Sequence, residues 1–297
     1  MTIPSSHLIL CPSLAIAIIS KTIESRKFLI THPWFLSWGD HIFQPLYTNR
    51  NYKSVFLGKR LTMIVNSRFN GPPNSGNGGY VGGLMAKEIG GIVQVTLHKP
   101  PPLDVEMKLA DQGEEWTLTH KNAIVARAKS SMVTIAPKVI PSMADAVLCE
   151  TRYPGFERHA FPHCFVCGPQ RSENDGLRLF TGVSGSGDYV AAPFRSFDDL
   201  YDDEGQMKTE FIWSALDCPG AYAITQIQEE KVLVLGRMTV DIKANINKSE
   251  KLIVSGWYLG SEKKKNYSGS AIINSDGEVK AIGEATWIEI DPRKFAS

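Results

Sequence analysis

The sequence predicts an α+β protein built from two similar units in tandem. Three observations support this prediction. The chain has 297 residues, which is enough for two domains of ordinary size. A strand, a loop, a helix and four further strands are expected twice between residues 61 and 290. The strand-like stretches alternate apolar and polar residues, as antiparallel strands with one buried face do.

The first unit is expected to span residues 61–138. It opens with a strand at 61–66, followed by a loop rich in Gly, Pro and Asn at 69–80 and a short helix at 80–91. Four strands are expected near 92–98, 103–110, 113–121 and 123–135, with breaks at prolines and glycines. Residues 139–162 carry several prolines and are interpreted as a linker.

The second unit, residues 163–297, repeats this layout. A strand is expected near 187–194, an acidic loop at 196–206 and a helix at about 207–225. Four strands near 231–243, 251–260, 264–274 and 277–290 complete it. The last two are joined by Asn274-Ser275-Asp276-Gly277, whose residue types favour a tight turn.

Residues 1–60 are expected to form an extension of uncertain order. Their apolar run at 8–19 is about 12 residues long, whereas a membrane-spanning helix needs about 20. We therefore expect no stable membrane span. Three interpretations of this segment remain open. It is a poorly packed extension, with Met63 as an alternative start, or an ordered cap, or a membrane anchor.

Composition narrows the functional classes. The chain is 43% hydrophobic and 21% charged, with a formal net charge of +1. Such a chain has no strong field to attract nucleic acid, so no nucleic-acid partner is expected. Its five cysteines are odd in number and irregularly spaced, which argues against a disulfide framework. Reduced cysteines are typical of cytoplasmic proteins, and we expect that location.

The segment at 163–180, HCFVCGPQRSENDGLRLF, contains the run Cys-Phe-x-Cys-Gly-Pro followed by Gly-Leu-x-Leu. It resembles a segment of hotdog-fold thioesterases related to the phenylacetate-pathway branch. The helical stretches at 69–86 and 212–223 are also similar to helices of that family. The resemblance covers about residues 63–292. It implies two hotdog domains, each a helix wrapped by a curved antiparallel sheet, which together form a pseudo-dimer. It also implies hydrolysis of acyl thioesters.

Thioester hydrolysis needs N–H donors for the oxygen that becomes negative, and a base or nucleophile. The start of the first helix offers free N–H groups and the positive end of the helix dipole. We expect the N–H groups of Gly79 and Tyr80 to bind the oxyanion, while Asn77 holds the carbonyl or a water. Asp217, on an otherwise apolar face of the second helix, is expected to activate water or attack directly. Gly78, Trp213, Gly220 and Tyr222 are the expected substrate-binding residues.

Two departures from the family favour one asymmetric site over two symmetric ones. Many relatives have His-Gly-Gly at the helix start, where this chain has Asn77-Gly78-Gly79. The first helix also has no acid aligned with Asp217. The absence of histidine at the helix starts argues against a dehydratase. It leaves a non-catalytic acyl-CoA or acyl-binding protein as the alternative to a hydrolase.

Other interpretations compete at particular residues. Asp217 is alternatively the cap of a helix broken by Pro219, and the Gly-rich loop is alternatively only a tight turn. Cys164 and Cys167 with His163 suggest zinc, but structural zinc needs four ligands, so we expect no metal and no cofactor. The lysines at 263–265 are CoA-phosphate ligands or a solvated turn. The expected partner is an acyl thioester of CoA or of a carrier protein, bound by a monomer or a homodimer.

Overall fold

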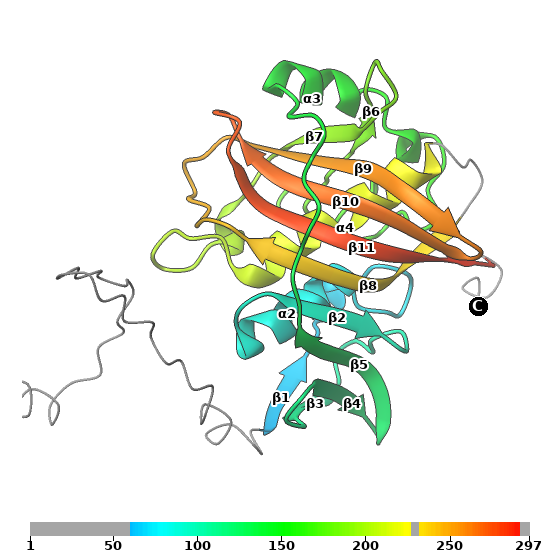
Figure 1. Cartoon of the computed structure of the whole chain (residues 1–297), viewed down its shortest axis with the longest axis vertical. Helices are drawn as coiled ribbons and strands as arrows, with labels where there is room; N and C mark the ends of the chain where they lie inside the picture. Colours follow the sequence, from blue (N-terminus) through cyan, green and yellow to red (C-terminus); the bar gives the residue numbers. More distant parts are fainter. Residues whose placement is uncertain (1–59, 227–231, 292–297) are drawn as a thin grey trace, which may run out of the picture. The chain divides into compact units, whose positions relative to one another are not determined.

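The computed structural model describes residues 60–226 and 232–291, and the strands in these residues form one antiparallel sheet (Figure 1). The expectations for the N-terminal extension therefore lie outside the described residues, apart from its last residue. The first half comprises β1 (Arg60–Ile64), α2 (Gly78–Ile89), β2 (Val93–Leu97), β3 (Glu106–Asp111), β4 (Trp116–His120) and β5 (Ala123–Ser130). The second comprises β6 (Gly182–Val183), β7 (Val190–Phe194), α4 (Thr209–Thr225), β8 (Val232–Ile242), β9 (Leu252–Glu262), β10 (Lys265–Asn274) and β11 (Val279–Ile290). Both halves therefore have the predicted order of elements.

The strand order is the same in both halves. Across the sheet it runs β1-β3-β4-β5-β2 and then β8-β11-β10-β9-β7-β6. In each half, the strand after the helix thus lies at the seam and pairs with the last strand of its own half. The seam itself is an antiparallel pairing of β2 with β8, in which Val93 lies opposite Val240 and Thr96 opposite Arg237. The seam makes one continuous sheet of the two halves.

The strands next to α4 are buried on both faces. On one face of β10, the Ser270 hydroxyl donates a 2.7 Å hydrogen bond to the Leu216 carbonyl of α4. On the other face, Ala271 and Ile273 belong to a cluster against which Val133 and Ile135 pack. Those two residues come from the segment after β5, which Figure 1 shows crossing β8–β11. All residues of β10 from Ser268 to Asn274 are buried, as expected for a strand that is covered on both faces.

The predicted linker contains a helix that the sequence analysis missed. Residues Met143–Glu150 form α3, which packs against β7. Its start is a capping box, in which the Ser142 hydroxyl accepts a hydrogen bond from the Asp145 N–H and the Asp145 carboxylate accepts one from the Ser142 N–H. The spacing Ser-x-x-Asp was visible in the sequence, but the neighbouring prolines favoured a linker.

No helix within the described residues has both the length and the apolar character needed to cross a membrane.

Candidate active site

The start of α2 is fixed by the side chain of Asn77. This residue is the N-cap of α2, and its Oδ1 accepts a 2.9 Å hydrogen bond from the Tyr80 N–H. Asparagine is favoured at this position because it satisfies an N–H that has no partner inside the helix. The side chain is buried, with 3% of its surface exposed. The amide oxygen of Asn77 therefore caps the helix, and the amide nitrogen can donate a hydrogen bond to another group.

Asp217 of α4 meets this helix start. Its Oδ2 accepts hydrogen bonds from the Asn77 Nδ2 at 2.8 Å and from the Gly79 N–H at 2.9 Å. Asp217 is buried, and its Oδ1 has no hydrogen-bond partner among the described residues. The structure thus brings together Asn77, Gly79 and Asp217, as the sequence analysis expected for a shared site. It leaves one carboxylate oxygen uncommitted.

Glycines of α2 allow this approach. A Cβ on Gly79 would lie 2.6 Å from the Trp213 carbonyl oxygen and 2.8 Å from the Asp217 Cβ. A Cβ on Gly83 would lie 2.5 Å from the Glu210 Cα. Side chains at these positions would push the two helices apart. The glycines lie inside the helix, so the tight-turn interpretation does not describe them. These glycines make room for α4. The sequence analysis had expected them to make room for a substrate instead.

The environment of Asp217 perturbs its ionisation. Burial raises the pKa of Asp217 to about 7, against the opposing effect of the Gly79 N–H. The nearby Cys164 raises the pKa further, and the Asn77 amide lowers it. A carboxyl with such a pKa exists in both protonation states near neutral pH. This is the range that general acid–base chemistry uses.

One alternative for this region is excluded, and the role of the helix N–H groups stays a prediction. The helix is not broken at Pro219, because α4 is continuous from Thr209 to Thr225 and Asp217 lies within it. Asp217 is therefore not the cap of α4. The N–H groups expected to bind an oxyanion are also not free in this conformation. The Gly79 N–H donates to Asp217 and the Tyr80 N–H donates to Asn77.

The four expected substrate-binding residues pack against different neighbours. A Cβ on Gly78 would lie 2.9 Å from side-chain atoms of Leu97 and Leu235, so this glycine packs against β2 and β8. The Trp213 ring covers Gly82 of α2 and is buried. Gly220 faces β10, and the Tyr222 hydroxyl is hydrogen-bonded to the Tyr153 hydroxyl at 2.7 Å. Their roles in substrate binding stay predictions, and these placements are those of packing residues.

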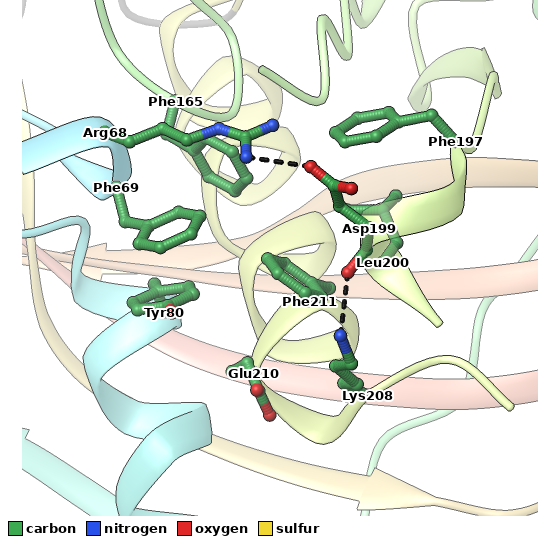
Figure 2. Close-up of a pocket in the computed structure, with 10 residues that line it drawn as sticks. All are labelled: Arg68, Phe69, Tyr80, Phe165, Phe197, Asp199, Leu200, Lys208, Glu210 and Phe211. Atoms are coloured by element: carbon green, nitrogen blue, oxygen red, sulfur yellow. Dashed lines mark hydrogen bonds and ion pairs between the residues drawn. The ribbon is translucent and has the colours of Figure 1, made fainter. Parts of the chain in front are cut away.

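A cavity of about 340 Å³ lies beside this junction (Figure 2). Its aromatic walls come from both halves of the chain, and the Phe69 and Tyr80 rings stack with centroids 4.1 Å apart. It is lined by Arg68, Phe69, Tyr80, Phe165, Phe197, Asp199, Leu200, Lys208, Glu210 and Phe211. Asp217 is not among them. Tyr80, next to Gly79, links the cavity to the buried junction.

The charged groups of this cavity are largely paired with one another. The Arg68 guanidinium lies 2.9 Å from an Asp199 carboxylate oxygen, and the Lys208 ammonium donates a 3.0 Å hydrogen bond to the Asp199 carbonyl (Figure 2). Glu210 is buried, and one of its carboxylate oxygens has no partner among the described residues. The sequence analysis missed Glu210. Its spacing of seven residues from Asp217, two helical turns along one face, was the available signal.

Comparison with known proteins places the fold. No protein-family model matches the sequence, and no curated protein matches it either. Among solved structures, a TesB protein of Mycobacterium avium subspecies paratuberculosis is similar with a TM-score of 0.53 and 12% identity, over 78% of this chain and 93% of that one. A candidate thioesterase of Novosphingobium aromaticivorans gives a TM-score of 0.53 and 10% identity, over 78% and 96% of the two chains. A candidate thioesterase II of Thermobifida fusca gives 0.50 and 11%, over 80% and 95%. The predicted resemblance is thus confirmed at the level of the fold: this chain has the hotdog-like fold of thioesterases.

Proposed function

We propose that this chain is a tandem double-hotdog hydrolase of acyl thioesters, with one active site between its two halves. The observation that carries this proposal is the hydrogen bonding of the Asp217 carboxylate to the start of α2. A buried carboxylate beside a helix N-terminus supplies both a base and a stabiliser of negative charge. The two functions come from opposite halves, which accounts for the shared site.

The chemistry follows from the two oxygens of Asp217. When a thioester binds, its carbonyl oxygen replaces Asp217 Oδ2 as the acceptor of the hydrogen bond from the Gly79 N–H. Asp217 then removes a proton from a water molecule, and the hydroxide formed attacks the carbonyl carbon. The resulting oxyanion is held at the helix start, the C–S bond breaks, and Asp217 returns the proton to the leaving thiolate. Direct attack by Asp217 to give an anhydride, which water then hydrolyses, is the alternative route.

The aromatic cavity is the proposed acyl site. Phe69, Tyr80, Phe165 and Phe211 offer an apolar surface, and Tyr80 follows Gly79 in the sequence. An acyl group seated against these rings places its thioester near the start of α2. Apolar walls with a few polar groups are typical of sites for small ligands. The acyl donor is CoA or a carrier protein, and one chain already holds both halves of the site.

A single site is supported by the residue that replaces Asp217 in the first half. Counted from the start of each helix, Ala86 of α2 takes the position that Asp217 has in α4. Ala86 is buried and has no ionisable group. At the start of α4, Lys208 makes no side-chain capping hydrogen bond. The mirror image of the proposed site therefore lacks its carboxylate.

The test is release of free thiol from a panel of acyl-CoAs with aliphatic and aromatic acyl groups. We expect Asp217→Asn to lower kcat/KM by about 100-fold or more, as loss of a general base does. Asp188→Asn makes the same chemical change at an exposed position and should retain full activity. If Asp217→Asn keeps the kcat/KM of the wild type, Asp217 is not the base. Single turnover in ¹⁸O water tests the direct route, because water that attacks the Asp217 carbonyl of the anhydride leaves its label in that carboxylate.

A second candidate is an acyl-binding protein without hydrolysis. The observation that favours it is that the N–H groups of Gly79 and Tyr80 already have acceptors, Asp217 and Asn77. If acyl-CoA binds by calorimetry but the wild type releases no thiol above the blank, this second function replaces the first. Binding should then be unchanged in Asp217→Asn and weakened in Phe211→Ala.

A further inference from the structure

Three cysteines from two distant segments converge behind the candidate active site. Cys164 and Cys167 lie in the loop before β6, and Cys218 lies in α4. Their sulfur atoms all lie within 4.8 Å of one another, and the Cys164 and Cys218 sulfurs are 3.8 Å apart. All three are buried, with 3%, 4% and 9% of their surfaces exposed, and all are free thiols. Neither segment alone contains the cluster.

The loop that carries the first two cysteines is held by a tight turn. The turn is closed by the Gly168 N–H, which donates to the Cys164 carbonyl at 2.9 Å. A Cβ on Gly168 would lie 2.6 Å from backbone atoms of Cys164, so this turn requires glycine. The thiolate is the form of cysteine that binds metals.

One of the three sulfur–sulfur separations matches that expected around a bound metal ion. Zinc–sulfur bonds of about 2.3 Å in a tetrahedral site place two sulfurs about 3.8 Å apart. This equals the 3.8 Å separation of the Cys164 and Cys218 sulfurs. Buried thiolates also need a compensating positive charge. Thiolates are soft ligands and select soft or borderline cations over Mg²⁺ and Ca²⁺.

We propose that Cys164, Cys167 and Cys218 bind one thiophilic cation, either Zn²⁺ or Cu⁺. Zn²⁺ takes the three sulfurs and a fourth ligand from outside the protein, whereas Cu⁺ is satisfied by three. His163, considered with the first two cysteines in the sequence, is exposed and does not join them. His159, whose Nδ1 accepts a hydrogen bond from the Phe161 N–H, is not among the residues whose ligand atoms lie together here.

Such a metal ion would fasten the loop to α4, because Cys218 belongs to the helix and the other two ligands belong to the loop. Cys218 also follows Asp217 directly in the sequence. Metal binding would thus restrain the part of α4 that carries the candidate base. The inference does not depend on thioester hydrolysis, since it concerns metal content and not turnover.

The test is the metal content of the full chain, purified under reducing conditions without chelators and then offered ZnCl₂ or Cu⁺ anaerobically. We expect about one equivalent of one of these metals per chain after desalting, and cobalt substitution should give a thiolate-to-cobalt charge-transfer band. X-ray absorption distinguishes the two metals by their ligands. Zn²⁺ should have three sulfur neighbours and one lighter atom, whereas Cu⁺ should have three sulfur neighbours alone. Cys218→Ser should lower the stoichiometry to about one tenth or less.

Cys149→Ser is the matched control, because Cys149 is also a buried free thiol but lies in α3. It should bind metal like the wild type. The wild-type measurement stands on its own if Cys218→Ser fails to fold. The proposal is overturned if the folded, reduced wild-type chain retains neither metal, or if Cys218→Ser folds and binds as much metal as Cys149→Ser does.

Discussion

The two halves of the sheet share one strand order but differ in what they supply. In the first half, β2–β5 have five to eight residues each, and α2 has 12 residues with four glycines. In the second half, β8–β11 have 10 to 12 residues each, and α4 has 17 residues with Trp213 and Asp217. The first half contributes the glycines and the helix N–H groups of the junction. The second half contributes the large Trp213 side chain and the Asp217 carboxylate. The same topology therefore supports two different contributions to one junction.

The largest expected effect tests whether α4 supplies the bulk. Trp213→Ala should lower the free energy of unfolding by about 3–5 kcal/mol, as truncation of a buried tryptophan does. Only 1% of the Trp213 surface is exposed, and its ring packs on Gly82 of α2. Urea unfolding measures the change. Trp116→Ala is the control, since Trp116 of β4 is only partly buried and should cost less. Equal losses would contradict the assignment of Trp213 to the core.

A smaller effect tests whether α2 supplies the space. Gly83→Ala should destabilise the protein by about 1–3 kcal/mol, because the new Cβ meets backbone atoms of α4. Gly185→Ala places the same methyl group where nothing lies within 4 Å, and should change stability by less than about 0.5 kcal/mol. Thermal unfolding of both variants gives the comparison. If Gly83→Ala lowers stability as little as Gly185→Ala does, the contact between α2 and α4 does not require glycine at position 83.

The helix start of the first half can be tested separately. Asn77→Ala should cost about 1–2 kcal/mol, since it removes the cap of α2. Asn77→Ser restores a capping oxygen and should recover most of this loss. Chemical unfolding of the two variants separates the cap from the hydrogen bond to Asp217. A serine variant as unstable as the alanine variant would show that the amide contact with Asp217 dominates.

The smallest effect concerns a charge pair of the second half. Lys280 is buried, and its ammonium lies 3.3 Å from the Glu250 carboxylate. Burial raises the pKa of Glu250, but the Asn247 N–H and Lys280 outweigh it and hold the pKa below its usual 4.5. A lowered pKa stabilises the fold at higher pH, and the contribution is lost as the pH falls below 4.5. Glu250→Gln should cost about 0.5–1 kcal/mol at pH 7 and progressively less in acid. Stability curves from pH 7 to pH 3 check this, and a constant difference would contradict it.

The sequence predicted the fold well because its signals were local. Alternation at Met107 and Leu109 of β3 and the turn at Asn274–Gly277 marked the strands, and the Cys164–Pro169 run marked the family resemblance. The meeting of Asp217 with Asn77 and Gly79 was also predicted, because two facing halves require it. Helix α3 was missed, since its capping box of Ser142 and Asp145 lies among prolines.

Contacts between distant segments were beyond the sequence. Nothing in the spacing of Cys164 and Cys167 indicates that Cys218 completes a cluster, because that depends on how α4 packs against the loop. The occupation of the Gly79 N–H by Asp217 depends on helix separation, which glycine spacing suggests only once the partner helix is known. The aromatic cavity could not be predicted from the sequence either, because its walls come from both halves.

Ala86 of α2 and Asp217 of α4 lie equally far from the starts of their helices, and only one of them carries an ionisable group. In a homodimer of identical single units, one substitution alters both sites at once, because the same gene encodes both subunits. A chain that carries both units escapes this constraint. Within a single chain, one position can carry a carboxylate and the other a small side chain, so a substitution at one leaves the other unchanged.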